Sequence, residues 1–375
     1  MALRTAVVGC GQIARVTHLP NIVRCEETVL DTVCDILPDA AAEAAEEFGA
    51  RRWCTDWRDV IGSEEIELLM LCTHTELRAD LIVAALEAGK PVYTEKPMAG
   101  TEEELDRILR SARETGVPVC VGHNRRSGPA VREFKRLFDR ACRVGAGRPA
   151  SMDRTEGRHP RVAEERQAQL LLRVNDDSRS WKDWVFEDPM GIIFVEMVHF
   201  ADLALWFMER EVVEVSAVGS HVGNVASMIR FADDSLATLS HTMVGNFEYP
   251  KELYEGTAGN VTVAMDHHLE VRQCGLEGEA FRTYFPPKDV PQGVGRQGIE
   301  AYYEVIERFE MSGSEPGEHP ATPAVDKGHL EHLRRFAEHV QGRGENPCPA
   351  EAAGHSTRVA LRMREAAASR KPVRV

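Results

Sequence analysis

Short apolar segments alternate with helical segments through the first 123 residues, and this alternation strongly limits the folds open to the chain. Apolar runs typical of buried strands occur at residues 3–9, 29–35, 51–55, 66–73, 91–95 and 117–122. Helical segments separate them, so each strand is expected to run parallel to its neighbours. The pattern predicts an α/β fold with a doubly wound parallel sheet, which binds ligands at the carboxyl ends of its strands.

The turn after the first strand has the sequence GCGQIA and runs from Gly9 to Ala14. In a dinucleotide-binding turn Gly9 would permit the tight bend, Gly11 would let the backbone approach a pyrophosphate, and Ala14 would allow close helix packing. The N–H groups at the start of the next helix, at Gln12 and Ile13, are expected to bind the phosphates. We therefore predict a dinucleotide site at this turn.

Asp35 closes the second strand, at about the distance along the chain where dinucleotide-binding folds carry an acid, roughly 20 residues on. Its carboxylate is expected to accept hydrogen bonds from the adenosine ribose hydroxyls and to repel a 2′-phosphate. Because Ile36 and Leu37 add no positive charge, NAD is favoured over NADP. The alternative is that Asp35 serves only as a helix N-cap beside Pro38.

Three motifs follow one another in the chain: GCGQIARVTHLP at residues 9–20, ALEAGKPVYTEKPMA at 85–99 and VGHNRRSGPAV at 121–131. With them the sequence resembles the Gfo/Idh/MocA family, the glucose-fructose oxidoreductase and inositol dehydrogenase group. The resemblance implies an N-terminal Rossmann domain and a C-terminal α+β domain with a large, mainly antiparallel sheet. It also implies an NAD(P)-dependent oxidoreductase that acts on CH–OH groups of sugars or cyclitols.

Lys96 occupies the lysine position of the EKP element in this family. The resemblance implies that Lys96 lies between nicotinamide and substrate, with Glu95 beside the cofactor, and that the bond to Pro97 is cis. A strand end points into the ligand crevice, and a following proline keeps the lysine extended, so the position itself fits this role. The alternative is an ordinary solvated lysine.

The sequence departs from the family pattern after the fourth strand. Family members show a Thr-Pro pair followed by a histidine, whereas this chain has Thr73 and His74, with Arg78 near the expected histidine. Thr73 and His74 are expected to contact the cofactor, with contacts around the nicotinamide that differ from those of the family.

The alternation of helices and parallel strands stops near residue 124. Strand-like runs joined by turns follow at residues 214–222, 225–232, 236–244, 253–265 and 269–274. Such runs predict an antiparallel sheet. We therefore expect a Rossmann domain at residues 1–123 and a substrate-binding and oligomerisation domain at 124–375, and the resemblance implies a homodimer or homotetramer formed through the second sheet.

A helix expected at residues 188–208 has only three charged or titratable residues between Ile192 and Met208, which form a stripe of Glu196, His199 and Asp202. Residues spaced by three spread over about 120° of a helix surface, so a buried helix of this kind needs something polar to face. A bound substrate fits, although an internal carboxylate–imidazole network is the alternative. The resemblance implies proton transfer by His199; the family's aspartate would fall at Val195, and Glu196 is its nearest replacement.

Other polar residues are candidates for substrate binding. Trp181 and Lys182 lie in a loop-like segment, where a tryptophan face can stack on a sugar and polar groups can bind hydroxyls. Arg125 and Arg158 are further candidates. A surface loop anchored by aromatics, and solvated arginines, are the alternatives.

Composition restricts the partners and the location. A formal net charge of -15 disfavours nucleic acid, and the sequence has neither an apolar run of membrane-spanning length nor a secretory signal pattern, so we expect a cytoplasmic protein without membrane partners. The nine cysteines include no CxxC pair, and no metal site is expected.

Together these features predict an NAD-dependent dehydrogenase that oxidises a secondary hydroxyl of a sugar, glycoside or cyclitol. Neutral His199 would accept the hydroxyl proton while the Lys96 ammonium stabilises the developing alkoxide; which group acts first stays open. Two alternatives remain: transient use of bound NAD for glycoside elimination or hydrolysis, and a non-catalytic sugar or NAD sensor.

Overall fold

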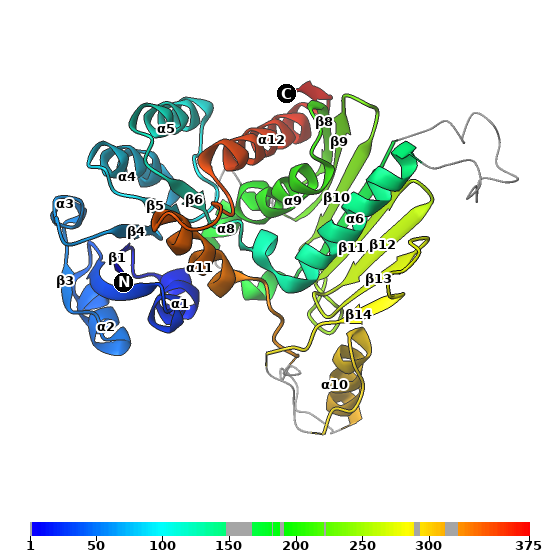
Figure 1. Cartoon of the computed structure of the whole chain (residues 1–375), viewed down its shortest axis with the longest axis horizontal. Coiled ribbons are helices and arrows are strands. Elements are labelled where there is room, and N and C mark those ends of the chain that lie inside the picture. The colour runs from blue at the N-terminus through cyan, green and yellow to red at the C-terminus, as the bar shows by residue number, and fades with distance from the viewer. Residues whose placement is uncertain are drawn as a thin grey trace, which may run out of the picture. The chain divides into compact units, whose positions relative to one another are not determined.

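A computed structural model of the chain (Figure 1) describes residues 2–147, 167–181, 183–187, 191–220, 223–288, 293–311 and 322–375. The chain forms two compact units. The first consists of residues 1–127 and 328–361, and the second of residues 128–327 and 362–375. The division of roles between residues 1–123 and 124–375 stays a prediction; in space, residues 328–361 join the N-terminal unit.

The first unit is built on a six-stranded sheet of parallel strands, which confirms the predicted fold class (Figure 1). Its strands are β1 (Leu3–Val8), β2 (Thr28–Cys34), β3 (Arg52–Cys54), β4 (Leu68–Leu71), β5 (Val92–Thr94) and β6 (Val119–Val121). Their order in the sheet is β3-β2-β1-β4-β5-β6. The order reverses between β1 and β4, where open parallel sheets bind ligands.

The helices of the first unit are η1 (Ala14–His18), α1 (Leu19–Arg24), α2 (Pro38–Phe48), α3 (Trp57–Ile61), α4 (Thr75–Glu87), α5 (Glu102–Thr115), η2 (Asn124–Ser127) and α11 (His329–Val340). Helix α5 begins with a capping box, in which the Thr101 hydroxyl accepts the Glu104 N–H and the Glu104 carboxylate accepts the Thr101 N–H. It ends where Gly116 takes the left-handed conformation.

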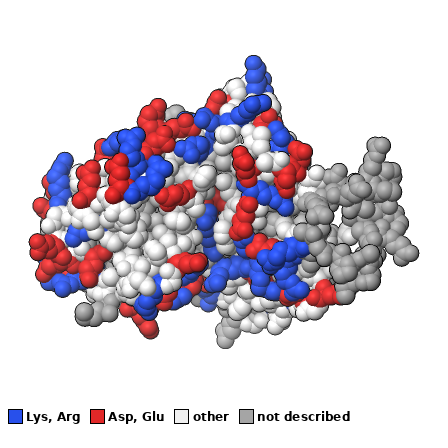
Figure 2. All heavy atoms as spheres, turned by 45° about the horizontal axis from the view of Figure 1, so that its top comes forward, with Lys and Arg blue, Asp and Glu red and all other residues white. Residues whose placement is uncertain are grey.

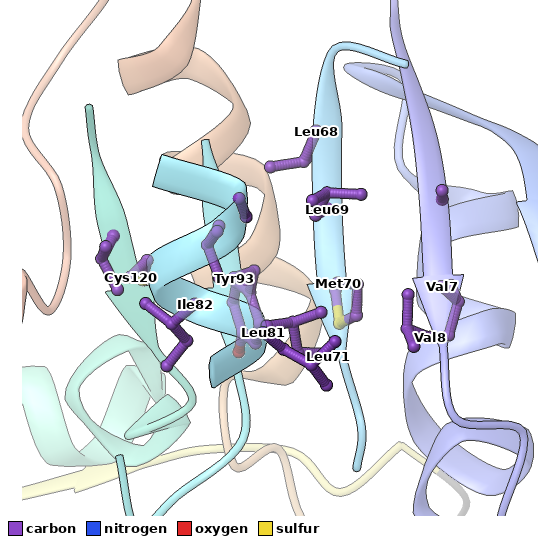
Figure 3. Packing of buried hydrophobic residues seen from close by; sticks show 14 of the residues in the cluster. Val7, Val8, Leu68, Leu69, Met70, Leu71, Leu81, Ile82, Tyr93 and Cys120 are labelled. Carbon is purple, nitrogen blue, oxygen red and sulfur yellow. The ribbon is translucent and has the colours of Figure 1, made fainter. Parts of the chain in front are cut away.

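The core of the first unit consists of apolar side chains of the central strands, which pack against apolar side chains of α4 (Figure 3). Val7 of β1 and Met70 of β4 are fully buried, and Ile82 of α4 lies against the same cluster. Burying each large apolar side chain stabilises a fold by about 1.5–3 kcal/mol. This core holds the strand ends in place, and those ends carry the candidate site.

The segment after residue 328 completes this unit beside β6. His332 of α11 is fully buried, with Nδ1 2.9 Å from the Ser127 hydroxyl and Nε2 3.0 Å from the Val121 carbonyl. Asn346 donates to the Val119 carbonyl at 2.8 Å. These contacts close the edge of the sheet that β6 would otherwise leave open.

The second unit is built on a nine-stranded sheet, which confirms the expected large, mainly antiparallel sheet. Its strands are β7 (Gln169–Asn175), β8 (Val212–Gly219), β9 (Asn224–Phe231), β10 (Leu236–Thr242), β11 (Glu252–Ala258), β12 (Val261–Asp266), β13 (Glu270–Cys274), β14 (Arg282–Tyr284) and β15 (Val373–Arg374). Their order is β14-β13-β12-β11-β7-β10-β9-β8-β15, and β7 and β10 pair in parallel.

The helices of the second unit are α6 (Pro129–Gly147), η4 (Ser178–Ser180), α8 (Asp183–Glu187), η5 (Ile193–Met197), α9 (Val198–Met208) and α10 (Ile299–Met311), while α12 (Ala350–Ser369) contributes residues to both units. Helix α6 packs against β11 and β12. A Cβ on Gly256 of β11 would lie 2.7 Å from the Phe138 ring of α6, so this strand position needs glycine for close packing.

On the face drawn in Figure 2, acidic and basic side chains lie next to one another in several places. Among the described residues, Arg136 forms ion pairs with both Glu133 and Glu279. Among the described helices, none combines the length and the apolar composition that crossing a membrane requires.

We predict that His332 makes the fold sensitive to acid. Burial lowers the pKa of His332 to about 3, below its ordinary value near 6.5 in an unfolded chain. Its contribution to stability is therefore complete above about pH 6.5 and is lost progressively as the pH falls toward 3, with a slope of about 1.4 kcal/mol per pH unit. His332→Gln keeps one donor and one acceptor but does not titrate.

The measurement is the free energy of unfolding by urea at several pH values between 4 and 7. We expect the variant to lose stability less steeply than the wild type on acidification. If the unfolding free energy of His332→Gln falls with pH as steeply as that of the wild type, His332 takes up its proton in the folded protein as readily as in the unfolded chain.

Candidate active site

The carboxyl ends of five strands in the first unit form one level row. In the sheet register, Val8 of β1 pairs with Cys34 of β2 and with Leu71 of β4. Leu71 pairs with Thr94 of β5, which in turn pairs with Val121 of β6. The predicted cofactor residues follow this row by one to six positions along the chain. The register therefore places them along one edge of the sheet, on loops that start at the same height.

The glycine turn fits tightly at its first residue and is open at its second. Gly9 has φ of +95°, and a Cβ there would lie 2.7 Å from the Cys72 carbonyl oxygen, so no other residue fits. Among the described residues beyond its chain neighbours, no atom lies within 4 Å of a Cβ built on Gly11. Ala14 is fully buried. The turn therefore leaves space for a ligand to approach the backbone at the second glycine only.

The helix after this turn offers its N-terminus to the same space. Gln12 and Ile13 are exposed, although Ile13 is apolar. The first N–H groups of a helix have no partner within the helix, so they are available to an anion such as a pyrophosphate. The turn and helix start thus fit the phosphates of a dinucleotide.

The Asp35 carboxylate ties the glycine turn to the next βα loop. Its Oδ2 accepts the Cys10 N–H at 2.8 Å, and its Oδ1 accepts the Leu37 N–H at 3.0 Å. The N-cap residue of α2 is Leu37, so the alternative of Asp35 as N-cap is not what the helix shows. Each carboxylate oxygen has a second acceptor direction, which leaves capacity for a ribose hydroxyl.

Arg78 connects the loops that follow β4 and β5. Its guanidinium donates to the Thr73 carbonyl at 2.5 Å and to the Pro97 carbonyl. Arg78 is buried, and burial lowers its pKa while the charge of Glu95 opposes that shift. His74 is the N-cap residue of α4. Arg78 lies near the position where the resemblance implies a histidine. Its guanidinium connects the loop after β4 with the loop after β5.

Glu95 is a carboxylate held by a histidine that the sequence analysis missed. His18 Nε2 lies 2.6 Å from Glu95 Oε1, and the His18 ring packs edge-on against Tyr93 with 5.7 Å between ring centroids. Burial alone would raise the pKa of Glu95, but the His18 hydrogen bond and the charges of His18, Lys96 and Arg78 lower it below its ordinary range. Glu95 is therefore ionised at neutral pH.

Lys96 follows directly and is half-buried. Its backbone N–H donates to Glu95 Oε2 at 3.1 Å, and the Lys96–Pro97 bond is cis, as the resemblance implied. Arg125 lies in η2, beyond the end of β6, and is buried. The first unit therefore carries Lys96, Glu95, Thr73, His74 and Arg125 on the loops of three neighbouring strands.

The polar stripe of the second unit is buried, as its sequence pattern requires. Glu196 lies in the π-helical turn η5, and His199 and Asp202 lie in α9. All three side chains are buried among apolar neighbours such as Phe200. The Glu196 carboxylate lies 3.1 Å from the Nζ of Lys251, a residue that the sequence analysis did not select.

Two of the predicted substrate residues, Arg158 and Lys182, lie outside the described residues. Trp181 is half-buried, and the Lys251 ammonium lies 5.6 Å from the centre of its ring. In the described part of the chain, no group of three or more His, Cys, Asp or Glu side chains is arranged to hold a metal ion.

The two glycines of the first turn give a matched pair of variants. Gly11→Ala adds a methyl group in open space, so we expect unchanged thermal unfolding but about tenfold or greater loss of NAD affinity, because the methyl group blocks close approach of the pyrophosphate. Gly9→Ala meets the Cys72 carbonyl and a left-handed backbone, so we expect a loss of stability of about 1–3 kcal/mol.

The measurements are calorimetric titration with NAD and thermal unfolding of both variants. NAD binding by Gly11→Ala with wild-type affinity would contradict the placement of the pyrophosphate at this turn.

Known proteins resemble this chain in sequence. Residues 3–123 match the model of the oxidoreductase family GFO_IDH_MocA, described as having an NAD-binding Rossmann fold. An uncharacterized oxidoreductase of Bacillus subtilis, YrbE, is 23% identical over 99% of this chain and 96% of its own length. Myo-inositol 2-dehydrogenase of Thermotoga maritima is 23% identical over 92% of this chain and 90% of its own length.

Solved structures share the fold. The scyllo-inositol dehydrogenase of Lactobacillus casei, solved with NAD(H) and scyllo-inositol, superimposes with a TM-score of 0.72 at 16% identity and covers 100% of this chain and 99% of its own. An oxidoreductase of Agrobacterium radiobacter, solved with NAD+, L-tartaric acid and magnesium, gives a TM-score of 0.76 at 14% identity, covering 100% of this chain and 98% of its own.

The glycine turn, the acid after β2 and the EKP loop lie along one strand edge, within the region that the family model matches. The cofactor is NAD, and the protein is an oxidoreductase. Residues 3–123 of this chain belong to the Gfo/Idh/MocA family of NAD-binding oxidoreductases, and relatives named as inositol dehydrogenases align with 92% and 74% of the whole chain.

Proposed function

We propose that this protein is a dehydrogenase that oxidises a secondary hydroxyl of a sugar, glycoside or cyclitol by hydride transfer to NAD. The level row of strand ends carries the proposal, because it aligns a dinucleotide turn with the loop that bears Lys96. Relatives with assigned substrates support the class: the Thermotoga enzyme acts on myo-inositol, and a relative from Pseudarthrobacter phenanthrenivorans, 25% identical over 73% of this chain, is a levoglucosan dehydrogenase.

The cofactor contacts follow from the edge of the first sheet. We place the phosphates at Gly9, Gly11, Gln12, Ile13 and Ala14, since the turn is open at its second glycine. Bound NAD supplies the hydride acceptor.

The ribose and nicotinamide contacts lie further along the same edge. We place the adenosine ribose at Asp35 and the nicotinamide side at Thr73, His74 and Glu95. NAD is preferred over NADP because the Asp35 carboxylate repels a 2′-phosphate, and the cation of the neighbouring turn, Arg15, is already paired with acidic residues of α2.

Lys96 and His199 divide the proton chemistry in this proposal. As hydride leaves the carbon, negative charge develops on the hydroxyl oxygen, and the Lys96 ammonium stabilises it by a charge-assisted hydrogen bond. The neutral His199 imidazole accepts the proton near pH 7. Glu196 or Asp202 fixes the orientation of the ring.

Substrate recognition is proposed for Trp181, Asp202 and Arg125, with Arg158 and Lys182 as predictions on residues outside the described part. Trp181 supports this role because its Nε1 is buried and has no acceptor among the described residues. An indole beside an ammonium is suited to stack on the C–H face of a sugar ring.

A homodimer or homotetramer through the second sheet also stays a prediction. On neighbouring strands β8 and β9, Val218 and Met228 expose apolar side chains on the face opposite the buried residues Val215 and Ile229. Cytoplasmic location likewise stays a prediction; it is supported by nine cysteines that are all free, as expected in a reducing compartment.

The first test is a screen of inositols, monosaccharides and anhydrosugars with NAD or NADP, read as absorbance of reduced cofactor. We expect net NADH formation with at least one polyol. Product formation without net NADH would favour elimination or hydrolysis through transient oxidation, and binding without any turnover would favour a sensor.

The second test removes the proposed proton-transfer groups. We expect Lys96→Ala and His199→Ala to lower kcat by about 100-fold or more, while NAD still binds. Lys90→Ala is the matched lysine control, because Lys90 lies at the amino end of the same strand and binds the Ser63 and Ile66 carbonyls. His355→Ala removes an exposed histidine of α12 and is the second control.

Steady-state kinetics with the identified substrate measure both sets. Wild-type rates for Lys96→Ala and His199→Ala would show that the site assignment is wrong. Equal losses in the controls would point to damage to the fold rather than to the chemistry.

A further inference from the structure

In the second unit, the ammonium of Lys251 lies between two carboxylates, in a group of side chains from four segments. Lys251 Nζ lies 2.8 Å from Asp176 Oδ2 and 3.1 Å from Glu196 Oε1. His241 Nε2 lies 3.4 Å from the same Asp176 oxygen. The side chains of Asp176 and His241 are completely buried, and that of Lys251 is 15% exposed. The group joins the β7 end, the β10 end, the start of β11 and the turn η5.

The sheet topology explains why these residues meet. Strand β7 lies between β10 and β11, and Val174 of β7 pairs with His241 of β10 and with Glu252 of β11. Because β10 runs parallel and β11 antiparallel to β7, the carboxyl ends of β7 and β10 lie beside the amino end of β11. Helix α9, which follows η5, packs on β7 and β10.

The backbone that carries Lys251 is firmly held. Its carbonyl accepts the Asn175 N–H at 2.7 Å, and its own N–H donates to His267 Nδ1 at 3.1 Å. The Asn175 side chain donates to the Asn246 carbonyl at 2.6 Å. A Cβ on Gly245 would lie 2.0 Å from Asn175 Oδ1, so this loop needs glycine there. These hydrogen bonds fix the backbone position from which the Lys251 side chain extends.

The charges of this group are unequal. One ammonium serves two carboxylates, and both carboxylates are buried, where an uncompensated charge is costly. Burial and the charge of Glu196 raise the pKa of Asp176, but the His241 hydrogen bond and Lys251 outweigh them and lower it. Removing Lys251 would leave two like charges facing each other, and one of them would have to take up a proton or move.

The contact between Lys251 and Glu196 bears on function because Glu196 lies three residues before His199. The family's aspartate would fall at Val195, and the acid is instead Glu196, in a π-helical turn directly before the α9 residue His199. Turns of this kind are often found at functional sites. The Lys251 ammonium, 3.1 Å from the Glu196 carboxylate, can fix the direction of this acidic side chain.

We propose that Lys251 is a positioning residue that holds the Glu196 carboxylate in a fixed orientation, three residues before His199 on the same helical segment. The inference rests on the proposed function, since it assigns Glu196 a part in that reaction.

A double-mutant cycle tests the inference. Lys251→Met removes the ammonium, Glu196→Gln removes the charge it holds, and the double variant removes both. We expect Lys251→Met to lower kcat/KM for the substrate by about 10- to 100-fold, mainly through kcat, and by less than about twofold when Glu196→Gln is already present. Lys251→Arg keeps the charge and is expected to restore most of the rate.

Lys327→Met is the matched control. Lys327 is a second partly buried lysine of the same unit, 3.0 Å from Glu252, and it tests the effect of removing a paired lysine as such. Thermal unfolding is measured for all variants, and Lys251→Arg and Glu196→Gln keep the test valid if Lys251→Met does not fold. Equal fold-losses from Lys251→Met with and without Glu196→Gln, or no rescue by arginine, would overturn the inference. Failure of the wild type to turn over any polyol would instead overturn the proposed function.

Discussion

The first unit depends on the close approach of the Gly9 turn to the Cys72 carbonyl. Because a Cβ at Gly9 would lie 2.7 Å from that oxygen, glycine alone lets β1 and β4 end at the same height with this turn between them. The level row then fixes the starting points of the loops after β2, β4 and β5. This packing therefore positions the Asp35 carboxylate and the EKP loop along one edge of the sheet.

Both units hold largely buried carboxylates that are paired with side chains of other elements. In the first unit, Glu95 is paired with His18 of η1 and lies near the charge of Arg78. In the second, Glu196 is paired with Lys251. Buried ion pairs add little net stability, because desolvation offsets their attraction. Their benefit to an enzyme is that the charges are already oriented before the reaction begins.

The sequence was most informative where the signal is local. Strand-like runs, the glycine turn, the acid at Asp35 and the polar stripe from Glu196 to Asp202 all depend on neighbouring residues, and the structure has the strands, the turn and the burial that these patterns predict. Lys96 was identified by a family element rather than by periodicity. Its role, like that of His199, stays a proposal.

The contacts that the sequence did not reveal join distant segments. His18 and Glu95 are 77 positions apart, and no local pattern links a helix histidine to a strand end; the one signal for His18 was its place in the motif GCGQIARVTHLP. In the sequence, Lys251 looks like an ordinary loop lysine. Only the pairing of β7 with β11 brings it close to the carboxylates. Residues 328–361 were placed with the second domain because a chain boundary says nothing of a later return to the first unit.

In the proposed reaction, a hydride passes from a polyol carbon to NAD bound at the β1–β4–β5 edge. The most direct measurement is the fate of deuterium placed on the oxidised carbon of the identified substrate. We expect the label to appear at C4 of NADH, on one face of the ring, in step with formation of the ketone. Ketone formation that leaves the NADH free of deuterium would contradict the proposed reaction.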